Sequence, residues 1–364
     1  MSSEVNFIRS MTDLKTVIKI NILAGTTCTI LGDPGIGKTE GVEQIINVMA
    51  DEGIHPMGWE PPENWAPKMV GFYASQHEGT DLSGYPVLSA DGEALTFKVM
   101  QKLRSLNEGD ALVIDEVTLA DENTLKPCLQ LTSGDRPSVN DWVGPQHVAR
   151  IMMGNLATSG NYDYVLNPVQ CNRGKVYEYL GPTVDEWLTY GMAKGLHPAI
   201  LTAIKMEGAS LLLNWNPSRD RNPTHRSWVT ASKSLLAAEH LYPGGVPMDV
   251  RLSELASAVG DSAALQVETL LTLQDKLVPY ATVVAHPTTA PVPDGHSDPE
   301  AQFLMATHVA NKCRPDDWSS VARYIERFPL ELQATMTSPI VARHPVLLTT
   351  SEYANYASRT GNLR

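Results

Sequence analysis

The sequence lacks any apolar run long enough to cross a membrane, and its four cysteines stand far apart along the chain. A membrane-spanning helix needs about 20 consecutive apolar residues, so we expect no membrane segment. Without a C-x-x-C pair, the cysteines predict neither a zinc site nor a disulfide framework, which is typical of a reducing compartment. The first residues, MSSEVNFIRSMTDL, contain no apolar core of a signal peptide. We therefore expect a cytoplasmic protein.

Basic residues are also scarce. Among 364 residues, 28 lysines and arginines face 41 aspartates and glutamates, which gives a formal net charge of −13. A general nucleic-acid binder normally presents a basic surface, so the charge favours a protein partner over DNA. It does not exclude a local basic channel. The length is enough for two or three domains.

Glycine, by contrast, is concentrated in LGDPGIGKTE at residues 31–40. Residues 32–39 match the phosphate-loop pattern G-x-x-x-x-G-K-[ST] at every fixed position. They separate a predicted buried strand at 26–31 from a predicted helix at 39–50, whose apolar residues recur at spacings of three and four. In such loops, glycines let backbone N–H groups surround phosphate oxygens, and the helix adds its N-terminal dipole. The expected nucleotide contacts are Asp33, Pro34, Gly35, Ile36, Gly37, Lys38, Thr39 and Glu40.

Two side chains of this loop have specific expected roles. Lys38 should reach the β- and γ-phosphates, and the Thr39 hydroxyl should bind Mg²⁺. The dinucleotide pattern G-x-G-x-x-G fails here, because Glu40 stands where its third glycine should be. The loop therefore favours a nucleoside triphosphate over a dinucleotide.

A second motif, LVIDE at residues 112–116, ends an apolar strand with two carboxylates. A nucleoside triphosphatase needs one carboxylate in the Mg²⁺ shell and a group that orients the attacking water. We expect Asp115 to hold Mg²⁺ together with Thr39, and Glu116 to act as the base. Taken alone, the pair is also compatible with an ordinary strand end, but the upstream phosphate loop gives it a chemical role.

The first half of the chain alternates predicted strands with helices, which favours a parallel sheet. Residues 87–97 contain Asp91-Gly92 between two apolar arms and predict a hairpin, which a helix at 98–106 should follow. The further expected strands lie at residues 70–74, 111–114, 148–153 and 175–180.

After Pro182 the pattern becomes helical. Residues 286–300 are rich in proline and polar residues and predict an exposed linker. The last 64 residues look helical at first and then irregular. The expected helices of this second part lie at residues 184–194, 199–207, 227–241 and 252–277.

Together, these motifs resemble an AAA+ ATPase: GDPGIGKT, then LVIDE, then a strand that ends in Asn155, then Arg173 before a fifth strand. The details resemble the MoxR branch. DLSGYP at residues 81–86, followed by the Asp-Gly hairpin, is similar to an insertion of that branch. Residues 166–173, followed by KVYEYLGPTVDEW, resemble its arginine-finger region. The resemblance covers about residues 10–240, and Glu40 departs from the serine or threonine often found after this loop.

The resemblance implies an α/β fold, with a parallel sheet flanked by helices, then a small helical lid domain and a C-terminal extension. The implied bounds are a nucleotide-binding core at residues 1–181 with a hairpin insertion near 79–97, a lid at 182–285, a linker at 286–300 and the extension at 301–364.

The resemblance also implies roles for residues beyond the two motifs. Asn155 would orient the lytic water or sense the γ-phosphate. Arg173 resembles the arginine finger that reaches the neighbouring subunit's site, with Arg136 as an alternative. Arg226 opens a lid helix and resembles the second sensor, which contacts the nucleotide. Two other candidates for that sensor lie close by: Arg219 and Arg221.

The implied function is Mg²⁺-dependent ATP hydrolysis in a homo-oligomeric ring, expected to be a hexamer, that remodels or activates a protein partner. Partners of this branch often carry a von Willebrand factor A domain. The alternative is a DNA-directed motor, such as a helicase or a replication or packaging accessory. Its only basic group near the insertion would be Lys98, Lys102 and Arg104. A third possibility is a scaffold that assembles but turns over slowly. Tyr85 could face the ring channel or simply pack.

Overall fold

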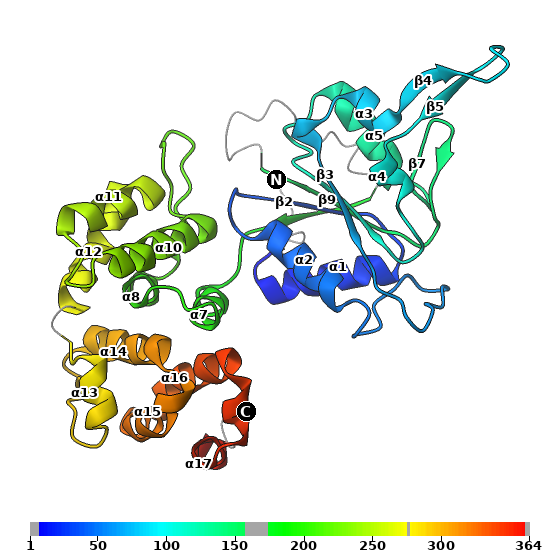
Figure 1. Cartoon of the computed structure of the whole chain (residues 1–364). Helices are drawn as coiled ribbons and strands as arrows, with labels where there is room; N and C mark the ends of the chain where they lie inside the picture. The colour runs from blue at the N-terminus through cyan, green and yellow to red at the C-terminus, as the bar shows by residue number, and fades with distance from the viewer. Residues whose placement is uncertain (1–6, 157–173, 275–276, 361–364) are drawn as a thin grey trace. The chain divides into compact units, whose positions relative to one another are not determined.

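The computed structural model describes residues 7–156, 174–274 and 277–360 (Figure 1). The chain divides into two compact units, Met1–Thr183 and Val184–Arg364. The first unit is α/β and the second is helical, which confirms the predicted fold class. Within the described ranges, no helix is both long and apolar enough for a membrane crossing.

The first unit is built on a parallel six-stranded sheet in the order β1-β10-β2-β9-β6-β3. Its central strands are buried and apolar, as expected for a parallel sheet covered on both faces. Because β2 and β6 flank β9, the segments that follow these three strands leave the same edge of the sheet. The strands are β1 (Phe7–Ile8), β2 (Cys28–Gly32), β3 (Met69–Tyr73), β6 (Ala111–Asp115), β9 (Ala149–Gly154) and β10 (Lys175–Tyr179).

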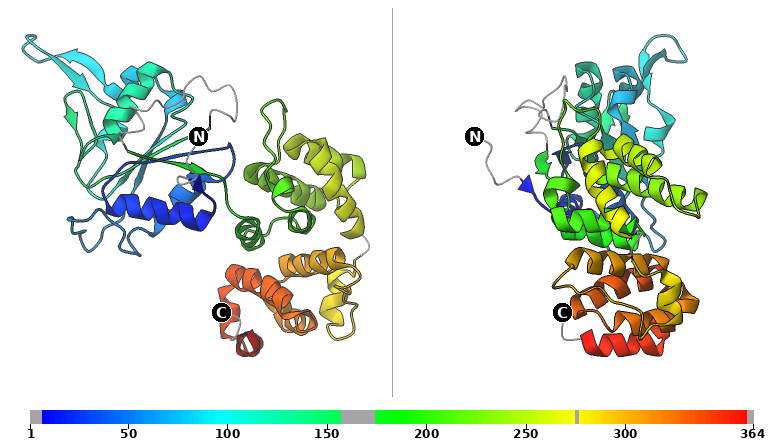
Figure 2. Two further views of the ribbon diagram at one scale, coloured as in Figure 1. Left: turned by 180° about the vertical axis from the view of Figure 1, so that it is seen from behind. Right: turned by 90° about the vertical axis from the view of Figure 1, so that its left-hand side faces the viewer.

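Helices cover both faces of this sheet. Alternate strand residues such as Phe72 and Ile114 form one core cluster with Leu103 and Leu125 from the helices. Views from opposite sides show α1 and α2 on the other face (Figures 1 and 2). The helices are α1 (Met11–Leu23), α2 (Lys38–Val48), α3 (Gly79–Ser83), α4 (Gln101–Arg104) and α5 (Glu122–Thr132).

Two hairpins extend from the first unit, and they are joined to each other. The Asn140 side-chain Nδ2 donates to the Ser83 carbonyl oxygen at 2.8 Å, and the Phe97 backbone N–H donates to Asp141 Oδ2 at 3.1 Å. The turn of the second hairpin therefore holds the base of the first. The strands are β4 (Tyr85–Leu88) and β5 (Leu95–Lys98), then β7 (Ser138–Val139) and β8 (Trp142–Val143).

Several sequence predictions need correction. The Asp91-Gly92 turn is wider than two residues, because the Ser89 N–H bonds the Ala94 carbonyl across it. The helix expected at 98–106 is limited to α4, since Lys98 still belongs to β5. The helix expected at 252–277 is broken by Gly260, whose φ of 85° interrupts the helical backbone.

The second unit contains two apolar cores, one formed by helices up to α12 together with Leu304 of α14, and the other by the helices that follow α12. The first group comprises α7 (Val184–Ala193), α8 (Pro198–Glu207), α9 (Ala209–Leu212), α10 (His225–Leu241), α11 (Met248–Val259) and α12 (Asp261–Gln274). The second comprises α13 (Tyr280–Ala285), α14 (Pro299–Lys312), α15 (Trp318–Ile325), α16 (Leu330–Arg343) and α17 (Ser351–Thr360). The chain is thus largely helical up to Thr360. The sequence pattern instead predicts an irregular last part of the chain.

The segment expected to be an exposed linker, residues 286–300, is held against the C-terminal helices. The Tyr324 hydroxyl donates to the Pro291 carbonyl at 2.7 Å, and Arg327 donates to the Ala290 carbonyl at 2.6 Å. Ala290 itself is 2% exposed, whereas most of residues 286–300 are exposed, as the proline and polar content predicts.

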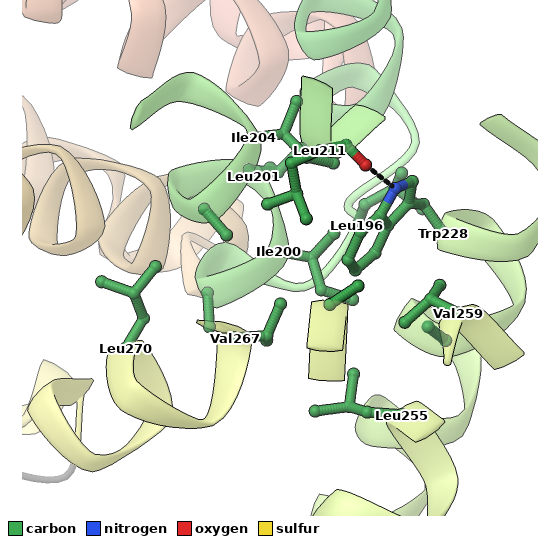
Figure 3. Packing of buried hydrophobic residues seen from close by; sticks show 14 of the residues in the cluster. Leu196, Ile200, Leu201, Ile204, Leu211, Trp228, Leu255, Val259, Val267 and Leu270 are labelled. Carbon is green, nitrogen blue, oxygen red and sulfur yellow. Dashed lines mark hydrogen bonds between the residues drawn. The ribbon is translucent and has the colours of Figure 1, made fainter. Parts of the chain in front are cut away.

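Trp228 of α10 is the largest fully buried side chain in the first of these two cores (Figure 3). Its indole N–H donates to the Leu211 carbonyl oxygen at 3.0 Å. We expect Trp228→Ala to lower the free energy of unfolding by about 3–5 kcal/mol, because it leaves a cavity. Urea denaturation followed by circular dichroism measures this. Leu241→Ala is the control, since Leu241 is 71% exposed and should cost less than about 0.5 kcal/mol. Equal effects of the two variants would contradict the assignment of this core.

Candidate active site

The phosphate loop connects β2 to α2 and has the backbone that its glycines predict. Gly35 and Gly37 have φ angles of 74° and 93°, a region that other residues rarely adopt. At Gly32 a Cβ atom would collide with the Tyr179 carbonyl oxygen, so the loop leaves the sheet where only glycine fits. Ile36 is 1% exposed and fixes the middle of the loop in the core. The remaining backbone forms a cradle of the kind that binds phosphate oxygens.

Lys38, the first residue of α2, lies inside this loop and is only 8% exposed. Its ammonium group donates to the carbonyl oxygens of Gly32 at 2.8 Å and Asp33 at 2.9 Å. A third bond, of 3.0 Å, goes to Asn155 Oδ1 at the end of β9. A buried ammonium needs such acceptors, and these place its charge at the centre of the loop.

Thr39 and Asp115 form the pair that the sequence assigns to Mg²⁺. The Thr39 hydroxyl donates to Asp115 Oδ2 at 2.9 Å, which joins the start of α2 to the end of β6. Within the described residues, no group of three or more His, Cys, Asp and Glu side chains could hold a metal ion. Mg²⁺ commonly takes one or two protein oxygens, with waters and substrate phosphates as its other ligands. One hydroxyl and one carboxylate at this spacing therefore fit that ion.

Glu116 follows directly after β6 and has a φ of 58°, which is unusual for a residue other than glycine. Its backbone N–H donates to Asp115 Oδ1 at 2.7 Å. Its own carboxylate accepts a hydrogen bond from the Ser75 hydroxyl. The two neighbouring carboxylates thus face different partners, Thr39 for one and Ser75 for the other, and can serve different roles.

Asn155 lies just beyond β9 and is tied at two points. Its side-chain oxygen accepts from Lys38, and its backbone N–H donates to Thr118 Oγ1 at 2.9 Å. The end of β9 is therefore connected both to the phosphate loop and to the segment after the acidic pair. Sequence reasoning missed Ser75 and Thr118. No local pattern marks Ser75, because it reaches Glu116 only through the pairing of β3 with β6, which places Tyr73 opposite Asp115.

The other predicted nucleotide contacts, Glu40, Pro34 and Asp33, lie in different surroundings. Glu40 accepts a 2.7 Å bond from Gln44 Nε2 on its own helix. Pro34 and Asp33 are half-buried in the loop. Burial, together with repulsion from Asp33, raises the pKa of Glu178 on β10. Acidic groups therefore stand beside the loop, and the positive charge available to a phosphate comes from Lys38 and the backbone.

The roles of three arginines stay predictions. Arg173 lies outside the described residues. Arg226 is the second residue of α10 in the second unit, and its contact with nucleotide stays a prediction. Arg136 is exposed in the segment before β7. Tyr85 is 56% exposed, so it is not a packed aromatic, and its hydroxyl donates to Asp81 at 2.8 Å.

No family model matches the chain, and no curated protein sequence matches it. Several solved structures are similar at low identity. A RuvB mutant from Thermotoga maritima is 14% identical with a TM-score of 0.38, over 77% of this chain and 74% of that chain. NtrX from Brucella abortus, in complex with ATP, is 12% identical with a TM-score of 0.39, over 85% and 67%. Likenesses this weak assign no activity to the chain.

Proposed function

We propose that the chain is an AAA+ ATPase that hydrolyses ATP with Mg²⁺. The observation that carries this is the meeting of Lys38, the Thr39–Asp115 pair, Glu116 and Asn155 at the carboxyl ends of β2, β6 and β9. Phosphoryl transfer depends mainly on positioning and on charge stabilisation, and these side chains supply both. ATP would bring the phosphoanhydride bond, and Mg²⁺ would supply positive charge that stabilises the transition state.

Each side chain has a separate task in this proposal. Lys38 holds the β- and γ-phosphates, while Thr39 and Asp115 hold the metal ion. Glu116 takes up a proton from the attacking water, and Asn155 orients that water. The Ser75 hydroxyl donates to the Glu116 carboxylate and holds its orientation.

The assembly we propose is a homo-oligomeric ring, a hexamer by resemblance, in which Arg173 reaches the site of the next subunit. The test is ATP turnover per subunit against protein concentration, for the native chain and for Arg173→Ala. We expect specific activity to rise with concentration, and Arg173→Ala to assemble but lose about 10³-fold or more in kcat. Turnover that is independent of concentration and of Arg173 would contradict the ring. Loss in Arg136→Ala instead would move the role to that arginine.

A protein partner, such as one with a von Willebrand factor A domain, is the target that we propose for this motor. The net charge of −13 supports it over DNA. The basic group near the insertion also offers less positive charge to DNA than the sequence suggests. The Lys102 ammonium already donates to the Gly71 carbonyl and lies 4.9 Å from the centre of the Phe72 ring. DNA-stimulated turnover would instead favour the DNA-directed motor.

Ser75 provides a test of the Glu116 assignment. We expect Ser75→Ala to lower kcat by about 10- to 100-fold, because the Glu116 carboxylate loses the hydroxyl that holds its orientation. Ser75→Thr keeps the hydroxyl and should restore turnover. Single-turnover hydrolysis at saturating ATP measures this, and native turnover in Ser75→Ala would contradict a role for Ser75.

A further inference from the structure

A cavity of about 540 Å³ lies in the first unit, away from the phosphate loop. Its lining includes Glu108, which precedes β6, and Gln146, which precedes β9. It is therefore at the amino ends of these strands, whereas the proposed ATP site is at their carboxyl ends. Strands rise by about 3.3 Å per residue, so a strand of five residues separates the two sites by roughly 16 Å.

Two arginines from different elements line this cavity: Arg104 at the end of α4 and Arg136 before β7. Across the described parts of the chain, neither guanidinium has a hydrogen bond or an ion pair with the protein. The two arginines stay unpaired within the described residues although acidic residues outnumber basic ones in the sequence. Their charge is thus available to a ligand.

Glu108, which also lines the cavity, does not neutralise these arginines directly. Its carboxylate accepts from the backbone N–H of Gln146 at 3.0 Å and of His147 at 2.8 Å, and lies 2.9 Å from His147 Nδ1. Although burial raises the pKa of Glu108, these backbone bonds outweigh it and lower that pKa below its usual value. The carboxylate is therefore ionised but directed at the segment before β9. Among the lining residues, two arginines against this one carboxylate leave a net positive charge.

Trp142 adds flat apolar surface to the same lining. Its half-buried ring packs over Gly144, where an added Cβ would lie 2.6 Å from the ring. Aromatic rings of this kind stack with nucleobases, and guanidinium groups bind phosphate oxygens in pairs. The cavity volume is in the range of small-molecule sites and exceeds that of a phosphate alone.

We propose that this cavity binds one nucleotide unit, with its phosphate on Arg104 and Arg136 and its base against Trp142. The unit comes either from a free nucleotide or from a nucleic-acid single strand, since both carry the same phosphate and base. This site is separate from the phosphate loop, so a failure of the proposed ATPase activity would not contradict it.

The experiment compares the native full-length chain with the double variant Arg104→Ala/Arg136→Ala. The matched control is Arg314→Ala/Arg323→Ala, which removes the same charge from two exposed residues of the second unit. One arm measures the fluorescence anisotropy of a labelled short oligothymidylate over a salt series. The other arm counts radiolabelled ADP bound per chain by equilibrium dialysis.

We expect at least one probe to bind, and the double variant to weaken it about tenfold or more while the control stays within about twofold. For the strand, the slope of log K against log salt should become shallower by about 0.7 for each phosphate that the double variant no longer neutralises. In the ADP arm the native chain should bind one more ADP than the double variant. If the phosphate loop did not bind ADP, the number of ADP molecules bound would fall equally for the native chain and the double variant, and this difference would remain.

Three results would overturn the proposal. The native chain could bind neither probe at millimolar concentration. The double variant could bind both probes as tightly as the native chain. An oligoglutamate of equal charge could displace the strand as effectively as unlabelled strand does, which would reassign the cavity to an acidic peptide.

Discussion

Lys38→Ala is expected to lower kcat/KM for ATP by about 100- to 1,000-fold, the range seen when one preorganised charge donor is removed. The reason is geometric. The Lys38 side chain is 8% exposed, and its bonds to Gly32, Asp33 and Asn155 hold its ammonium at the centre of the phosphate loop. Steady-state hydrolysis and the affinity for a fluorescent ATP analogue measure the loss.

The matched control for this variant is Lys126→Ala on α5. Lys126 is exposed and pairs with Glu122 at 3.2 Å, so its loss should leave turnover unchanged. A thermal melt of each variant separates lost chemistry from lost folding. If Lys38→Ala kept native turnover with a native melting temperature, residues 32–39 would not be the nucleotide site.

Glu116→Gln is expected to separate binding from chemistry. The amide keeps the shape of the side chain and can still accept from the Ser75 hydroxyl, but it cannot take up a proton from water. We expect kcat to fall by about 10²- to 10⁴-fold, the usual contribution of a general base. Affinity for ATP should stay within about threefold, because Lys38 and the loop backbone are untouched.

Glu122→Gln is the control for this second prediction, since Glu122 is an exposed carboxylate on the following helix. Single-turnover hydrolysis and nucleotide binding are measured on both variants. Loss of binding in Glu116→Gln would mean that Glu116 holds the metal ion. Full turnover would mean that the base is another group.

The site was predictable where its chemistry lies within one short segment. The phosphate loop and the acidic pair are local patterns, and the rule that parallel strands share an edge places them together. The role of Asn155 came only from the family resemblance, and its place after a strand of the same sheet brings it to this edge. Ser75 could not be found this way. Its contact with Glu116 spans 41 residues and depends on β3 lying next to β6, which neither local sequence encodes.

The fold shows the same limit. Hydrophobic spacing identified the core strands. It did not reveal the break at Gly260 in the helix expected at 252–277, because the apolar periodicity continues through that break. Proline content predicted exposure for residues 286–300, and most of them are exposed. The bonds that hold Ala290 and Pro291 were not predictable, because Arg327 and Tyr324 come later in the chain. The first hairpin was predicted, but the β7–β8 hairpin and its bonds to the first were missed, because a turn at Asn140 has no strong local signal of its own.

The β4–β5 hairpin is anchored by Asn140 and Asp141 at its base, while residues 90–93 at its tip are exposed. A spectroscopic label at Ala90 would therefore sit on an arm that turns with the first unit, instead of reporting only its own local motion. A pair of such labels, one on each neighbouring subunit of an assembly, would report rotation between subunits as a change in energy transfer. The hairpin thus offers a labelling position for following the orientation of the first unit in solution.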